Sequence, residues 1–398
     1  KYFKNEDVER AKYWVNKRVG YGEITVPLLD HNVEEVECIG PGFPITVVLR
    51  NSKKCMRAVT NIVLPTEEDV RAVVERLAVR SNKPLNLAKP YLEFSLPEGH
   101  RVAATISSEI SIPGSTFDIR KFPKDPFTII DLIKFGTIDV LTTSYIWFLL
   151  NYKPFIMILG PTGSGKTTLM NALLVLLNPE WKILTIEDIP ELNLHNPYWV
   201  KFVARKSLDP SLEVSLYQLA MLALRYRPDF LVIGEVRGRE IEALVHSATS
   251  GHGTITTFHG LTPSDVLVRV NALLNRDTAN LFMSTVTNFI TVTNVVENGE
   301  SRRKVIAVYE KGGEGKKREF LKLPLAESNE VTESEVEDFV KKSVLIRKIT
   351  ESMGKPIDYA VEDMLRKVEF LKRMTERNAD IPELRRELKK FYGGGLTK

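Results

Sequence analysis

The sequence predicts an α/β protein in which a doubly wound, mostly parallel sheet domain follows a smaller α/β domain. Short apolar runs alternate with helical segments through the middle of the chain, which is typical of a parallel sheet covered by helices on both faces. Nearer the N-terminus, apolar residues recur at every second position, as they do in half-buried strands. The predicted strands of the parallel sheet are 155–159, 181–186, 230–233, 254–258 and 288–295.

The N-terminal domain is predicted to follow a helical segment that covers residues 1–20. Within the domain, Thr66 is expected to cap a helix, because acidic residues fill the next three positions and suit the positive end of the helix dipole. Sheet and helix together over about 100 residues favour a self-contained α/β module. Its predicted strands are 23–29, 33–39, 45–49, 55–63, 91–96 and 101–106.

Two prolines and several charges in Lys121–Phe127 indicate a boundary between domains. A helix-rich stretch, 128–151, leads into the parallel sheet, and charged helices such as 332–350 and 358–377 follow it. We therefore expect an N-terminal helical segment 1–20, an α/β domain 21–121, a linker 122–137, the parallel-sheet domain 138–310 and a C-terminal helical region 311–398.

The composition is that of a globular protein, with 43% hydrophobic and 27% charged residues. A net charge of +4 over 398 residues gives no argument for nucleic-acid binding. Two cysteines, Cys38 and Cys55, are too few for a disulfide framework or a four-ligand zinc site. No apolar stretch of about 18 residues and no signal-peptide pattern occurs, so we expect a cytoplasmic protein that reaches the inner face of a membrane through a partner.

The strand 155–159 ends in a glycine-rich turn with the spacing G-x-x-x-x-G-K-T, the phosphate-binding loop or P-loop. Such a loop points several backbone N–H groups at one centre, and the helix that follows adds a positive dipole. Lys166 is expected to reach the β- and γ-phosphates, and the Thr167 hydroxyl to hold Mg²⁺. The residues predicted to bind the nucleotide are Gly160, Pro161, Thr162, Gly163, Ser164, Gly165, Lys166, Thr167 and Thr168.

Titratable side chains follow three other strands of the predicted sheet. Ligands of open α/β sheets bind outside the carboxyl ends of the strands, so we expect these side chains to meet at the P-loop. Glu235 is expected to hold Mg²⁺ through water, Glu187 to orient or deprotonate the attacking water, and His259 to sense the γ-phosphate. Asp188 and Glu191 stay open, because an acidic residue after a strand is often a helix cap.

The arginines near residue 237 have two interpretations. Most exposed arginines are solvated surface residues, yet a P-loop site commonly needs a cation on the γ-phosphate. We take Arg237 as a candidate catalytic residue. The positions left undecided between surface and site are Arg205, Arg225, Arg227 and Arg239 and, among the histidines, His252.

Four motifs occur in order along the chain, namely Gly160–Thr168, Ile186–Glu191, Arg227–Gly238 and Ser250–His259. Together they resemble the Walker A, Asp box, Walker B and His box of the type II/type IV secretion ATPases. That superfamily includes the motors of pili and archaella. The upstream stretch Ile110–Phe122 is similar to the end of the family's N-terminal domain, especially in its archaeal branch.

The resemblance implies a RecA-like ATPase domain and a PAS-like N-terminal domain, with ATP and Mg²⁺ in the cleft between them. It also implies a homo-hexamer that drives a polytopic platform protein at the cytoplasmic face of the membrane, with no specific nucleic-acid partner. Glu187 would be the catalytic base, Glu235 the Walker B acid and His259 the His-box sensor. Arg101 and Arg120 would reach the phosphates from the N-terminal domain. The four-cysteine zinc module of bacterial type II members has no counterpart here, so no zinc is expected.

The leading hypothesis is a hexameric Mg²⁺-dependent ATPase that powers secretion or the assembly of a type IV pilus-like or archaellum filament. A nucleic-acid-translocating ring ATPase is the alternative, but basic runs such as Lys372–Arg377 have glutamates among or near them and fit solvated helix faces. A scaffold that binds nucleotide without hydrolysing it is disfavoured by the intact Lys166, Thr167 and Glu235. Which machine the motor would serve stays open.

Overall fold

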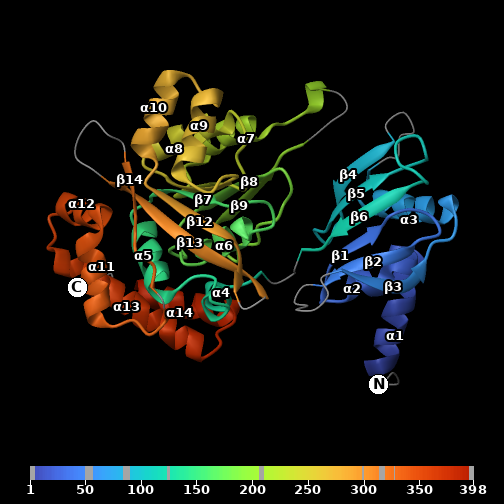
Figure 1. The fold of residues 1–398 in the computed structure, drawn as a ribbon, viewed down its shortest axis with the longest axis horizontal. Coiled ribbons are helices and arrows are strands. Elements are labelled where there is room, and N and C mark those ends of the chain that lie inside the picture. Colours follow the sequence, from blue (N-terminus) through green and yellow to red (C-terminus); the bar gives the residue numbers. More distant parts are fainter. Residues whose placement is uncertain are drawn as a thin grey trace. The chain divides into compact units, whose positions relative to one another are not determined.

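In the computed structural model the chain forms two compact units, Lys1–Lys124 and Asp125–Lys398 (Figure 1). The structure describes residues 5–49, 57–83, 90–122, 126–205, 210–297, 300–312, 319–326 and 328–393. The predicted α/β class, with a small first domain and a larger, mostly parallel sheet after it, is confirmed. None of the helices within the described ranges is long and apolar enough to cross a lipid bilayer.

The smaller unit is a six-stranded antiparallel sheet of order β3-β2-β1-β6-β5-β4. Helix α3 (Glu67–Arg80) contributes Val70, Val74 and Leu77 to the unit's core, and Thr66 caps it as predicted. Helix α1 spans Asn5–Val15, followed by a π-helical turn, Asn16–Tyr21. The strands are β1 (Val33–Cys38), β2 (Pro44–Leu49), β3 (Arg57–Val63), β4 (Tyr91–Ser95), β5 (Arg101–Thr105) and β6 (Thr116–Arg120).

The strand predicted at 23–29 is wrong, because this stretch forms a 3-10 turn, Gly22–Ile24, and helix α2, Thr25–Leu29. The Thr25 hydroxyl donates to the Gly22 carbonyl oxygen at 2.6 Å and closes the turn. Ile24 and Leu28 are both buried in the core, and their four-residue spacing places them on one face of a helix. The alternation of apolar residues therefore predicted a strand where the chain forms a helix. Strand β6 was not predicted.

The larger unit is an eight-stranded sheet of order β14-β13-β12-β7-β11-β10-β8-β9. The six strands from β12 to β9 in this order run parallel, and β13 and β14 add an antiparallel edge. All five predicted strands are present. The bounds are β7 Phe155–Leu159, β8 Ile183–Glu187, β9 Trp199–Val203, β10 Phe230–Ile233, β11 Gly253–Phe258, β12 Asn288–Glu297, β13 Glu300–Gly312 and β14 Glu319–Lys322.

Helices cover both faces of this sheet, and each face has its own apolar core (Figure 1). Ile156 and Ile158 of β7 point to one core, and Phe155 and Met157 to the other, as strand alternation requires. One face is covered by α4 (Ile129–Lys134), α5 (Val140–Leu150) and α6 (Lys166–Leu174), and the other by α7 (Leu216–Ala223), α8 (Glu240–Thr249), α9 (Pro263–Leu273) and α10 (Arg276–Thr285).

The C-terminal helices belong to the same unit as the parallel sheet. Trp147 on α5 donates its indole N–H to the Tyr392 hydroxyl at 2.8 Å, and that hydroxyl contacts the Leu176 carbonyl oxygen just past α6. The last helix is thereby attached to the helix that follows the P-loop. The bounds are α11 Glu333–Lys342, α12 Val344–Ser352, α13 Ile357–Glu376 and α14 Ile381–Gly393.

A buried carboxylate joins these helices to the sheet. Glu310 on β13 is fully buried and accepts hydrogen bonds from the Tyr145 hydroxyl at 2.8 Å, the Ser343 hydroxyl at 2.6 Å and the Val344 N–H at 2.6 Å. Each donor would lose its partner if the carboxylate were removed. The burial of Glu310 is therefore supported by a satisfied network that ties α5 and the start of α12 to one strand.

We expect Glu310→Ala to lower the free energy of unfolding by about 3 kcal/mol or more, since it leaves several buried donors unpaired. Glu297→Ala is the control, because Glu297 forms an exposed ion pair with Lys304 at 3.0 Å and should cost less than about 1 kcal/mol. Urea unfolding followed by tryptophan fluorescence measures both. Equal, small losses in the two variants would contradict the role given to Glu310.

Candidate nucleotide-binding site

The P-loop joins β7 to α6, and its backbone excludes larger side chains at two points. A Cβ on Gly160 would lie 2.2 Å from the Val292 carbonyl oxygen of β12, so only glycine fits this close approach. Gly165, just before α6, has a φ of 91°, a conformation that favours glycine. The loop is thus shaped by the neighbouring strand and presents the N-terminal N–H groups of α6 at the carboxyl edge of the sheet.

Lys166, the first residue of α6, has only 8% of its surface exposed. Its ammonium donates to the carbonyl oxygens of Gly160 at 3.0 Å and Pro161 at 2.8 Å, and burial lowers its pKa. The Ser164 hydroxyl oxygen is buried in the same loop without a hydrogen-bond partner in the described structure. A buried cation resting on the loop's own carbonyls, beside an unpaired hydroxyl, fits a site for phosphate oxygens.

Glu235 follows β10 and lies between two basic side chains. Arg237 Nη2 is 2.6 Å from Glu235 Oε2, and His259 Nε2, just after β11, lies against Glu235 Oε1. Burial and the nearby Lys166 lower the pKa of His259, so its imidazole is mainly neutral at neutral pH. The structure therefore brings Lys166, Glu235, Arg237 and His259 together at one edge of the sheet.

Glu187, the last residue of β8, is almost completely buried, with 3% of its surface exposed. Its Oε1 accepts the N–H groups of Glu191 and Leu192, each at 2.8 Å. Its Oε2 has no hydrogen-bond partner among the described residues, and the Lys201 ammonium is 3.8 Å away. Burial raises the pKa of Glu187 to about 7 in spite of these donors.

Glu191 is placed differently from Glu187. The carboxylates that raise the pKa of Lys166 against the effect of burial are Glu235 and Glu191. Glu191 is half-buried, whereas Glu187 is fully enclosed and bonded to backbone. Of the three acidic residues in this motif, Glu187, Asp188 and Glu191, only Glu191 is among the groups that shift the pKa of the P-loop lysine.

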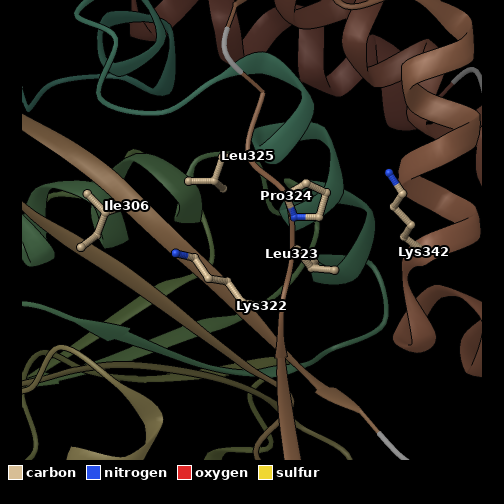
Figure 2. A pocket seen from close by; sticks show the side chains of 6 residues that line it. All are labelled: Ile306, Lys322, Leu323, Pro324, Leu325 and Lys342. Carbon is tan, nitrogen blue, oxygen red and sulfur yellow. The ribbon is translucent and has the colours of Figure 1, made fainter.

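A groove of about 500 Å³ opens beside the P-loop and His259. Its walls include Pro161, Leu261, Asp265 and Arg269, so space for a ligand adjoins the polar cluster. Figure 2 shows a separate pocket, lined by Ile306, Lys322, Leu323, Pro324, Leu325 and Lys342. Its lining offers two ammonium groups and no carboxylate or imidazole, so the residues suited to phosphoryl chemistry lie at the P-loop.

Arg101 and Arg120 belong to the smaller unit, where they are direct cross-strand partners on β5 and β6. Arg101 pairs with Glu93, and Arg120 Nε lies 4.0 Å from Glu35 Oε1. The structure thus places the two predicted arginines side by side, and their action on phosphate stays a prediction.

The positions that the sequence left undecided include three with local partners. The Arg205 guanidinium donates to the Leu212 carbonyl oxygen at 2.7 Å, and Arg239 lies 3.6 Å from Glu242. His252 Nδ1 lies 3.2 Å from the Ser247 carbonyl oxygen. Each of these three side chains therefore has a partner within the protein, and no bound ligand is needed to explain its position.

Arg303 on β13 was missed by the sequence analysis. Its Cδ atom lies 3.2 Å from the place that a Cβ on Gly165 would take, so the side chain packs against the P-loop. The signal in the sequence was a basic run, Arg302–Lys304, inside a strand, but the long β12–β13 pairing that brings it to the loop was not visible. Among the described residues, no group of three or more His, Cys, Asp and Glu side chains is arranged to hold a metal ion.

Relatives of this chain are found among archaeal proteins. One uncharacterised protein of Methanocaldococcus jannaschii is 41% identical over 238 residues, which cover 58% of this chain and 32% of the relative. A second uncharacterised protein of the same organism is 31% identical over 308 residues, which cover 76% of this chain and 54% of the relative. The chain thus spans about a third to a half of the length of these relatives.

The fold also resembles a solved structure, that of the Yersinia pseudotuberculosis ATPase DotB, with a TM-score of 0.54 and 16% identity over 97% of this chain and 94% of that one. This likeness concerns the fold alone, and it agrees with a RecA-like domain after a smaller N-terminal domain. The model of the family described as type II/IV secretion system protein matches residues 53–315, about two thirds of the chain. With the four motifs in place at one edge of the sheet, the chain belongs to the type II/IV secretion system protein family.

Proposed function

We propose that this chain is a Mg²⁺-dependent ATPase subunit of a hexameric motor that powers secretion or the assembly of a type IV pilus-like or archaellum filament. The observation that carries the proposal is the cluster at the P-loop, where Glu235 lies between Arg237 and His259 close to the buried Lys166. Membership of the secretion family supports the coupling to a membrane machine. The partner would be a polytopic platform protein at the cytoplasmic face of the membrane.

In this proposal the P-loop N–H groups and Lys166 hold the phosphates of ATP, with Lys166 exchanging the Gly160 and Pro161 carbonyls for phosphate oxygens. The Thr167 hydroxyl and, through water, Glu235 would hold Mg²⁺. The metal would supply charge neutralisation on the β- and γ-phosphates. Arg237 and His259 already contact Glu235, so they are placed to orient its carboxylate and to respond to the γ-phosphate.

Two carboxylates, those of Glu187 and Glu191, are candidates to orient the attacking water. Glu187 has a raised pKa and an unpaired Oε2, as a general base needs, but its Oε1 is engaged by backbone N–H groups. Glu191 is less buried and is electrostatically linked to Lys166. The partial exposure of Glu191 and its electrostatic effect on Lys166 favour Glu191 as the residue that orients the water, with Glu187 holding its backbone.

Arg101 and Arg120 are proposed to act on the phosphates when the two units close on bound nucleotide. Their position as neighbouring cross-strand partners would deliver two guanidinium groups together. Such positive charge stabilises the transition state of phosphoryl transfer rather than the ground state.

The first test is steady-state hydrolysis of ATP with Mg²⁺. We expect Lys166→Ala and Glu235→Gln to lower kcat at least about 100-fold, because both act on charge at the transferred phosphate. Lys304→Ala, at an exposed ion pair, is the matched control and should keep wild-type turnover. Full activity in both site variants would refute the site, and turnover that appears only with DNA would favour the nucleic-acid motor.

A second pair of variants distinguishes the role of the Glu191 carboxylate from that of Glu187. Glu191→Gln should lower kcat about 100-fold or more while nucleotide affinity is kept, since it removes a group needed by the attacking water. Glu187→Gln, whose amide oxygen can still accept both N–H bonds, should lower kcat less. The reverse order of the two losses would make Glu187 the base.

Arg120→Ala should lower kcat at least about tenfold and change the dissociation constant of ATP little, as expected for a group that acts on transition-state charge. The control is Arg57→Ala, because Arg57 forms an exposed ion pair with Glu37 at 2.6 Å in the same sheet. A proportional loss of binding and turnover in Arg120→Ala would instead indicate a role in folding.

A further inference from the structure

The segment 188–193, which carries Glu191, is held by three polar side chains outside the P-loop. Glu187 Oε1 accepts the N–H groups of Glu191 and Leu192, each at 2.8 Å. Lys201 Nζ donates to the Leu192 carbonyl oxygen at 3.0 Å. Asn171 Oδ1 accepts the N–H of Asn193 at 3.0 Å. Three consecutive residues are therefore fixed through their backbone, which leaves the Glu191 side chain free of these bonds.

These three side chains come from different elements of the site. Glu187 ends β8, and Lys201 lies on the neighbouring parallel strand β9, opposite Thr185. Asn171 lies on α6, the helix that begins with Lys166. The segment is thus tied both to the edge of the sheet and to the helix whose N-terminus forms the phosphate site.

The arrangement places polar groups where packing alone would favour apolar ones. Glu187 and Asn171 each have 3% of their surface exposed, whereas Lys201 lies on the exposed side of β9. Glu187 Oε2 and Asn171 Nδ2 have no hydrogen-bond partner among the described residues. Leaving buried polar atoms unpaired is unfavourable. Each of the three side chains makes a hydrogen bond to the backbone of residues 191–193, so the arrangement favours placement of that backbone over packing of the core.

We propose that Glu187, Lys201 and Asn171 form a positioning clamp that fixes the backbone of Glu191 and so sets where its carboxylate lies relative to Lys166. Lys201 and Asn171 are positioning residues in this account, because they act on the water only through Glu191. The inference rests on the proposed function, since it concerns the efficiency of the same hydrolysis. It assigns two residues that none of the four sequence motifs includes.

The clamp is tested first with Lys201→Met, which keeps the apolar stem and removes the donor to Leu192. We expect kcat to fall about tenfold or more, with KM for ATP within about twofold of wild type. Lys201→Arg should recover most of the turnover, because a guanidinium can still donate to the carbonyl. Lys182→Met is the matched control, since Lys182 also donates to a backbone carbonyl, that of Tyr226 at 2.7 Å, but at the other end of β8.

Amide hydrogen exchange in the nucleotide-free protein gives a readout that does not depend on activity. The N–H groups of Glu191 and Leu192 should exchange faster in Lys201→Met and in Asn171→Ala than in wild type, and should be unchanged in Lys182→Met. Binding of a fluorescent ADP analogue at wild-type affinity identifies variants that keep the folded P-loop. Asn171→Ala provides the same test should Lys201→Met fail to fold.

Wild-type kcat in folded Lys201→Met and Asn171→Ala would overturn the clamp, as would a lower kcat without faster exchange at Glu191 and Leu192. A fall in kcat matched by an equal rise in KM would also overturn it, because it would indicate general damage to the site. Failure of the proposed function looks different: the wild-type chain itself would not hydrolyse ATP, or Glu191→Gln would turn over normally.

Discussion

The Lys166 ammonium is nearly buried at the point where the parallel strands end, and its hydrogen bonds go to two carbonyl oxygens of its own loop. Burial of a cation is unfavourable unless oxygen ligands and negative charge compensate for the lost water. Here the two carbonyl oxygens are the oxygen ligands, and Glu235 and Glu191 provide the negative charge. The rest of the site is organised around this requirement, because the two acidic residues come from the segments that follow β10 and β8 at the same edge of the sheet.

The same requirement explains why nucleotide binding would rearrange the site. Phosphate oxygens carry more negative charge than carbonyls, so they would replace Gly160 and Pro161 as the partners of Lys166. The electrostatic pull of Lys166 on Glu235 would then weaken, and Glu235, with Arg237 and His259 at its sides, would be able to hold Mg²⁺ through water. A bound triphosphate would therefore change the partners of several charged residues at once. Such an exchange is a physical route from occupancy of the site to movement of the elements that carry them.

The sequence predicted five of the six parallel strands, the P-loop and the helix capped by Thr66, because these depend on local pattern and spacing. It failed at 23–29, where burial of Ile24 and Leu28 on one helical face outweighed an alternating pattern. Lys201 and Arg303 could not be found in this way, since their contacts, with Leu192 and Gly165, lie 9 and 138 positions away along the chain. Glu187 and Glu191 share one motif, and they differ in burial and in backbone hydrogen bonding, which appear only in the folded chain.

A structure of the chain with Mg²⁺ and ADP–aluminium fluoride, a mimic of the hydrolytic transition state, tests the central claim most directly. The account predicts that Lys166 Nζ leaves the carbonyls of Gly160 and Pro161 for phosphate oxygens, and that the Glu191 carboxylate contacts the attacking water. A structure in which Lys166 keeps both carbonyls, or in which the water is held by neither Glu191 nor Glu187, would contradict it.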